Sequence, residues 1–201
     1  MNTTNSEKSR KSIRTLVTSH KNLRALIESS MLVAIGFILS SIGVFKLPYG
    51  GRITILSMLP IIMIGIRNGA KWGIGSALVY SSLQILQEGL YPPIYPTALA
   101  YIVQALLDYI LAFSVLGLSA IFKRKKYGLV YGSILCISLR FLCHFASGII
   151  IWSETPWAIS AWIYSLTYNG AYMGPELIAT TTVSLIICKS AVRVQELGVR
   201  S

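Results

Sequence analysis

Long apolar segments, separated by short connections that are polar or rich in Pro and Gly, restrict this chain to a membrane. Of its 201 residues 54% are hydrophobic and only 12% are charged, whereas soluble domains carry about 25% charged residues. The apolar segments are Ala25–Val44, Ile53–Ile66, Lys71–Gln87, Thr97–Phe122, Gly128–Trp152 and Ile163–Cys188. A helix that crosses a bilayer needs about 20 such residues, so the second segment, which also contains Pro60, is expected to cross with an irregular stretch. We therefore predict an all-α integral membrane protein with six transmembrane helices in one bundle.

Outside this bundle the sequence predicts two polar extensions. Residues 1–24 form a basic N-terminal arm, residues 25–188 the six-helix membrane domain, and residues 189–201 a C-terminal tail. The three cysteines lie in apolar segments without the spacing of metal ligands, and they are expected to be small buried hydrophobic residues. The sequence predicts neither a metal nor a cofactor.

The basic residues lie mostly on one side of the predicted bundle. Of the 18 Lys and Arg residues, six are in the arm, two follow the second span, four follow the fourth span and three are in the tail. Only Lys46 and Arg52 lie on the other side, and Arg140 is inside a span. The positive-inside rule then places both termini in the cytoplasm and turns the loops 44–52, 88–96 and 153–162 outward. The net charge of +11 is therefore explained by membrane orientation, and no nucleic-acid partner is expected.

Three ionisable side chains cannot be placed outside the hydrocarbon: Asp108, Arg140 and Glu176. Such groups are costly in a bilayer and mark functional sites by default. Arg140 and Glu176 are expected to neutralise each other, which leaves Asp108 with an unmatched negative charge. That charge is matched either by a cation that arrives as a ligand or by a hydrogen bond to a neighbouring helix, including one to His144.

A row of residues along the fifth helix has the shape of a binding slot. His144, Gly148 and Trp152 are four residues apart and form one line about 12 Å long on a helix. An imidazole, a gap and an indole in a row fit a flat heterocycle. The alternative is that Trp152 belongs to an interfacial aromatic belt and His144 bonds to a neighbouring helix.

The first helix carries a pair of small residues, Ser30 and Ala34, four positions apart, followed by Gly36 and Ser40. Small residues at this spacing allow another helix to approach closely. The pattern is explained by packing within the bundle or by docking of another membrane subunit.

Four phrases of the sequence resemble one family of membrane proteins over residues 25–188. These are GGRITILSMLPI, LLDYILAF, RFLCHFASGIIIW and AWIYSLTYNGAYMGPE. In order and spacing they are similar to the thiamine-specific substrate-binding (S) components of energy-coupling factor (ECF) transporters, the ThiT or YuaJ proteins. The resemblance implies a six-helix protein that captures thiamine from outside. It also implies a transmembrane coupling subunit and two ATP-binding subunits as partners, in a bacterial cell membrane.

The same resemblance assigns candidate site residues. Asp108, followed by Tyr109, corresponds to the acidic residue that meets the thiamine aminopyrimidine, and the row on the fifth helix flanks the ligand rings. The predicted substrate-binding set is Asp108, Tyr109, His144, Gly148, Trp152, Tyr164 and Asn169. For Tyr164 and Asn169 the alternative is a polar helix start in an aromatic belt. Ser30 and Ala34 resemble the face that docks onto the coupling subunit, and Tyr49 takes the place of a lid tryptophan in the first outer loop.

The residues are also compatible with three alternative functions. One is an S component for another vitamin or for a thiamine precursor such as hydroxymethylpyrimidine. Another is a proton-coupled secondary transporter with Asp108, Arg140 and Glu176 as a relay, although the sequence shows no inverted repeat of broken helices. The third is an enzyme, and the sequence shows no catalytic constellation. There is also no G-xxxx-G-K-[ST] phosphate loop, so the energy for transport must come from elsewhere, and the family resemblance implies ATP-driven partner subunits as its source.

Overall fold

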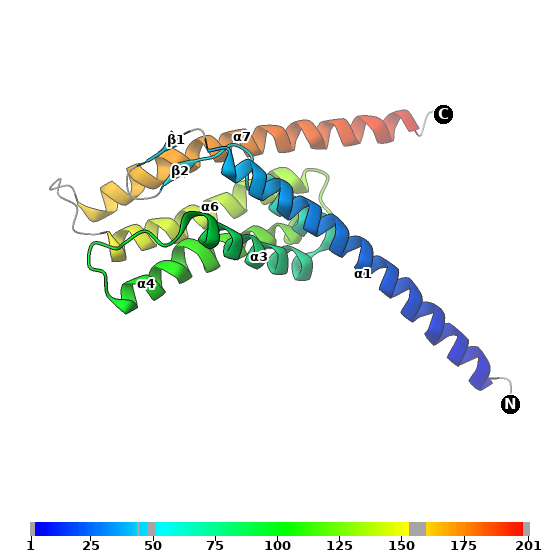
Figure 1. Ribbon diagram of the computed structural model, residues 1–201. Coiled ribbons are helices and arrows are strands. Elements are labelled where there is room, and N and C mark those ends of the chain that lie inside the picture. The colour runs from blue at the N-terminus through cyan, green and yellow to red at the C-terminus, as the bar shows by residue number, and fades with distance from the viewer. Residues whose placement is uncertain (1–2, 44, 48–50, 153–159, 199–201) are drawn as a thin grey trace.

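The computed structural model describes residues 3–43, 45–47, 51–152 and 160–198. Tyr49, most of the 153–162 loop and the end of the tail lie outside these residues. The described part of the chain folds into six helical segments that pack along one another, with a small hairpin at one end (Figure 1). The predicted number of helices and the all-helical class are confirmed.

The helical segments follow the predicted order along the chain. They are α1 (Thr3–Ser41), α2 (Leu59–Asn68), α3 (Ala70–Glu88), a compound segment, α6 (Gly128–Ile151) and α7 (Ala161–Gly198). The compound segment changes geometry along its length, from α4 (Ala98–Gln104) through the π-helix η2 (Ala105–Leu111) and α5 (Ala112–Ser114) to the 3₁₀-helix η3 (Val115–Phe122). Thr97 caps its start by accepting a hydrogen bond from the backbone N–H of Ala100 at 3.2 Å. The π-helix contains Asp108, and such turns occur frequently at functional sites.

Two helices are longer than the sequence analysis predicts. α1 continues back to Thr3 and α7 continues to Gly198, with no break at the predicted boundaries with the arm and the tail. The chain has no Gly or Pro before Gly36, so nothing in the arm interrupts the helical backbone. Both helices extend past the bundle at the same end, where the N- and C-termini lie (Figure 1).

The second segment begins later than predicted. The chain first forms a two-stranded antiparallel hairpin, β1 (Phe45–Lys46) and β2 (Arg52–Ile53), in which Phe45 pairs with Ile53. α2 then starts at Leu59, with Pro60 in its first turn, where the missing N–H costs no helical hydrogen bond. This helix has only 10 residues, too few to cross a bilayer alone. It is buried inside the protein instead, and Ile61, Ile62 and Ile64 are fully inaccessible.

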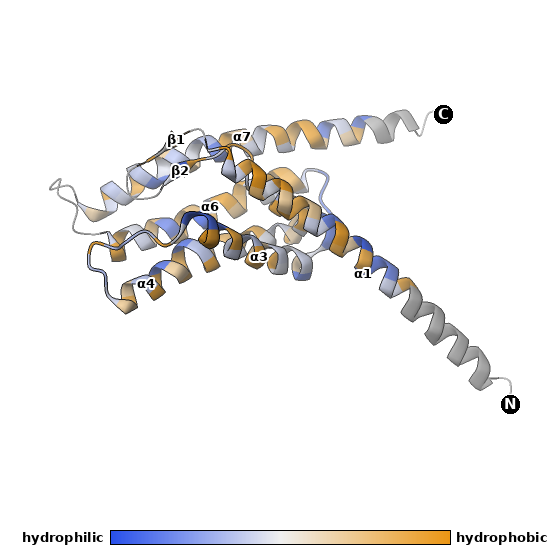
Figure 2. Ribbon diagram, viewed as in Figure 1, coloured by the Kyte–Doolittle hydropathy of each residue, from blue (hydrophilic) through white to orange (hydrophobic). Residues whose placement is uncertain are grey.

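The outer surface of the bundle is apolar over four of the helices. Val17–Ser41, Ala98–Phe122, Gly128–Ile151 and Ala161–Arg193 are long and apolar enough to cross a membrane. Large apolar side chains point outward from them, including Leu99 and Ile178, each 70% exposed. In Figure 2 much of these helices is orange, the colour of hydrophobic residues. In water such faces would aggregate, whereas lipid accommodates them.

Candidate functional site

The residues predicted to bind substrate all line one cavity at the hairpin end of the bundle. They come from η2, from α6 and the residue that follows it, and from α7: Asp108, Tyr109, His144, Gly148, Trp152, Tyr164 and Asn169. The cavity has a volume of about 130 Å³, which is small beside the roughly 300–1,000 Å³ of usual ligand pockets. A ligand of two rings therefore needs some of the lining side chains to move outward.

The carboxylate of Asp108 is held by two side chains of α6. His144 Nδ1 lies 2.9 Å from Oδ1, and the Ser147 hydroxyl donates to Oδ2 at 2.8 Å. Since the carboxylate only accepts, Nδ1 of His144 carries a hydrogen, and in the neutral imidazole Nε2 is then an acceptor. The predicted alternative of a hydrogen bond between Asp108 and His144 is thus present. Each carboxylate oxygen has two lone pairs, so both keep capacity for a further donor.

The predicted gap between His144 and Trp152 on α6 is not open in the structure. His144 and Trp152 both line the cavity, but a Cβ at Gly148 would lie 2.8 Å from Cβ of Ser165 on α7. Gly148 therefore allows α6 and α7 to approach closely, and the gap between the two rings is filled by α7 at that level. Trp152 follows the last residue of α6, and its ring centroid lies 6.2 Å from that of Tyr91.

The other predicted residues make contacts of their own within the protein. The Tyr109 hydroxyl donates to the carbonyl of Gly89 at 2.8 Å, and Tyr164 stacks on Tyr168 with ring centroids 5.5 Å apart. Asn169 is buried, donates to the carbonyl of Ser165 at 2.8 Å and accepts from the hydroxyl of Tyr172 at 2.7 Å. The Asn169 amide therefore stabilises α7 and fixes the Asn169 side chain on the cavity wall.

Arg140 and Glu176 do not form the expected pair. Among the described residues, no ion pair within 4 Å joins them. Glu176 accepts from the backbone N–H of Met58 at 3.1 Å and from Thr180 at 3.3 Å. The Arg140 guanidinium lies over the ring of Phe113, 3.7 Å from its centroid. Cation–π contact and backbone donors thus replace the salt bridge, because the two residues come to face different elements.

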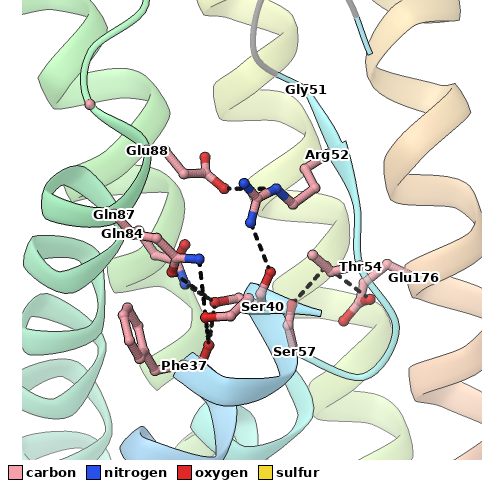
Figure 3. A network of polar contacts seen from close by, with 12 residues as sticks. Phe37, Ser40, Gly51, Arg52, Thr54, Ser57, Gln84, Gln87, Glu88 and Glu176 are labelled. Carbon is pink, nitrogen blue, oxygen red and sulfur yellow. Dashed lines mark hydrogen bonds and ion pairs between the residues drawn. The ribbon is translucent and has the colours of Figure 1, made fainter. Parts of the chain in front are cut away.

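Polar contacts join the hairpin to the helices around the cavity, and those of Arg52 and Gln84 are drawn in Figure 3. Arg52 lies 3.6 Å from the Glu88 carboxylate and donates to the carbonyl of Ser40 at 3.2 Å. Behind it, Gln84 donates to the Ser40 hydroxyl at 2.8 Å. On the other side the backbone N–H of Gly51 donates to the Tyr168 hydroxyl at 2.8 Å. These bonds hold β2 against α1, α3 and α7 at the cavity mouth.

Several lining residues were not among the predicted site residues, and they change its charge. Arg52, Glu88, Arg140 and Glu176 join Asp108 on the wall. Two arginines stand against three carboxylates, which gives the cavity one formal negative charge when His144 is neutral. Helix spacing alone could not identify Arg52 and Glu88. Arg52 lies in β2, within a stretch that the sequence predicts as a loop, and Glu88 is the last residue of α3.

The predicted docking residues lie elsewhere, on the outside of the bundle. Ser30 and Ala34 are exposed and line an apolar groove of about 560 Å³ between α1 and α3. Gly75 stands in the opposite wall, with no atom within 4 Å of the position of a Cβ. Gly36 and Ser40, by contrast, are buried, so this second pair serves packing within the bundle.

Comparison with known proteins gives consistent results at the level of sequence and fold. The sequence model of the family described as thiamine transporter protein (Thia_YuaJ) matches residues 26–196. The thiamine transporter ThiT of Bacillus subtilis is 33% identical over 189 residues, covering 86% of this chain and 94% of that protein. A solved structure of ThiT from Listeria monocytogenes superposes with a TM-score of 0.67 at 23% identity, over 86% of this chain and 97% of that one. With its apolar helices, the chain therefore belongs to the thiamine transporter protein family and is a multi-pass transport protein of a bacterial cell membrane.

Proposed function

We propose that this protein is the substrate-binding subunit of an ATP-driven ECF importer and that it captures thiamine in the cavity beside Asp108. The observation that carries the proposal is the composition of this cavity. Seven residues selected from the sequence line it together, and its formal charge is one negative unit. Thiamine is an aromatic cation with one fixed positive charge, so the charges match.

The chemistry of the wall fits both rings of that ligand. Trp152, Tyr164 and Tyr168 offer aromatic faces, which attract a desolvated cation by about 0.5–2 kcal/mol. Asp108 accepts a hydrogen bond from the aminopyrimidine and offsets the positive thiazolium. A neutral analogue leaves that carboxylate unmatched in a low dielectric, and it is rejected for this reason.

Titration of the purified protein with thiamine, followed by tryptophan fluorescence, tests the binding. We expect saturable quenching that is largely lost in Trp152→Phe, because Trp152 lines the cavity. Trp72 lines the groove between α1 and α3 instead, so Trp72→Phe serves as the matched control and keeps the quenching. Saturation by hydroxymethylpyrimidine at equal concentrations would identify a precursor as the substrate. If thiamine does not saturate the signal, thiamine is excluded as the substrate.

The orientation in the membrane rests on the distribution of basic residues. Fifteen Lys and Arg residues lie on the side of both termini and two on the side of the hairpin. This bias supports cytoplasmic termini and a cavity that opens to the outside. A reporter enzyme fused after Ser201 should be active in the cytoplasm, and activity confined to the outside would reverse the orientation.

The energy source is proposed to lie in partner subunits, which are a transmembrane coupling subunit and two ATP-binding subunits. Thiamine uptake should then stop when the ATP-binding subunits are deleted and should persist when the proton gradient is collapsed. The secondary-transporter alternative, with Asp108, Arg140 and Glu176 as a proton relay, predicts the opposite pair of results.

A further inference from the structure

Gln104 is a buried polar side chain of the cavity wall that the binding scheme above does not use. It is 3% exposed, lines the cavity and is the last residue of α4. Within the described part of the chain, its Oε1 has no hydrogen-bond donor. A buried amide oxygen without a donor destabilises a protein, so native structures rarely keep one unless something else supplies the donor.

The unmatched buried groups on this cavity wall include both acceptors and donors, since Nε and Nη1 of Arg140 also have no hydrogen-bond partner within the described part of the chain. His144 Nε2 is also buried without a partner among the described residues, and in the neutral imidazole it is an acceptor because Nδ1 faces Asp108. Asp108 keeps free lone pairs on both oxygens. The wall therefore presents acceptors from three side chains beside the two unmatched N–H groups of Arg140, and a ligand that satisfies the acceptors must carry several N–H bonds.

Gln104 and Asp108 are placed to receive the same group. Gln104 is the last residue of α4 and Asp108 lies in the π-helix η2 that follows it, and both residues line the same cavity. An exocyclic amine carries two diverging N–H bonds. One acceptor on each side of it satisfies both, whereas a carboxylate alone leaves the second without a partner.

We propose that Gln104 is a specificity-determining residue that accepts a hydrogen bond from the exocyclic amine of an aminopyrimidine whose other N–H meets Asp108. This inference rests on the proposed function, since it names the part of thiamine that Gln104 recognises. The site then recognises the amine through two acceptors on one cavity wall.

The test compares two ligands on matched variants. The ligands are thiamine and the analogue in which hydrogen replaces the exocyclic amine, and the quantity measured is the ratio of their dissociation constants. Gln104→Met keeps the volume but removes the acceptor, and we expect it to weaken thiamine binding about tenfold with little effect on the analogue. The ratio should therefore shrink about tenfold. Gln104→Glu keeps an acceptor and should preserve the preference for the amine.

Gln84→Met is the matched control. Gln84 is also buried and lines the cavity, but its Nε2 donates to Ser40. Its replacement should lower the melting temperature and leave the ratio unchanged. Gln104→Met, which deletes an unmatched group, should melt no lower than the parent without ligand.

The outcomes separate the inference from the proposed function. If the parent protein binds thiamine and Gln104→Met leaves the ratio unaltered, Gln104 does not read the amine and the inference is overturned. If the parent binds neither ligand, the proposed function itself fails. A ratio that shrinks in Gln84→Met as strongly as in Gln104→Met would also overturn the inference, because the effect would then belong to the wall in general.

Discussion

Replacing Asp108 by asparagine should weaken thiamine binding by about 2–5 kcal/mol, the usual cost of truncating one partner of a buried, charged hydrogen bond. The substitution keeps the size of the side chain and deletes the charge that offsets the cation. Asp108→Glu restores the carboxylate and should cost far less. Isothermal titration with thiamine on the three proteins measures the difference.

The contacts of Asp108 provide a control that separates its charge from its packing. Ser147 donates to Oδ2 at 2.8 Å, so Ser147→Ala removes one bond to the carboxylate without removing its charge. We expect a loss of only about 0.5–1.5 kcal/mol for this variant. The charge argument fails if Asp108→Asn binds thiamine as tightly as the parent while Asp108→Asn and Asp108→Glu both lower the melting temperature. Asp108 would then only hold η2 against α6.

A bulky side chain in the groove between α1 and α3 should reduce thiamine uptake without affecting binding. Ala34 is exposed in that groove, and Ala34→Phe fills the space into which we propose that the coupling subunit docks. Overpacking at a close helix contact costs about 1–3 kcal/mol, so uptake should fall about tenfold or more. The assay is accumulation of labelled thiamine in cells that carry the complete transporter.

The matched control for this variant lies on the same helix. Ile38 is 57% exposed and does not line the groove, so Ile38→Phe should leave uptake unchanged. Purified Ala34→Phe should bind thiamine with the affinity of the parent, because the groove is separate from the cavity. Normal uptake by Ala34→Phe would place the docking surface elsewhere.

The sequence predicted the helices well because their signal is local. Apolar length and breakers such as Pro60 are visible in one window of residues, and the segment from Thr97 to Phe122 ends where predicted. The hairpin was missed because strands of two residues carry no alternation pattern. The polar composition of residues 1–24 predicts an arm, but the stretch contains no helix breaker and α1 begins at Thr3.

The site was predictable only as far as single helices determine it. Spacing and family resemblance selected residues that do gather in one cavity, and their binding roles stay predictions. Contacts between helices were not accessible in this way. Arg140 was expected beside Glu176 but lies over Phe113, and Gly148 was expected to leave a gap but admits Ser165. Each outcome depends on how neighbouring helices rotate, and one sequence does not contain that information.

The open groove beside α1 also determines what kind of force can hold a partner there. In a bilayer its apolar wall is covered by acyl chains, so an arriving helix displaces lipid and not water. The hydrophobic effect then contributes little, and the strength of association depends on contact fit along Ser30, Ala34 and Gly75. Release of the partner then costs mainly this contact energy, because lipid refills the groove. A partner seated there would be exchangeable, and its occupancy would follow its concentration in the membrane.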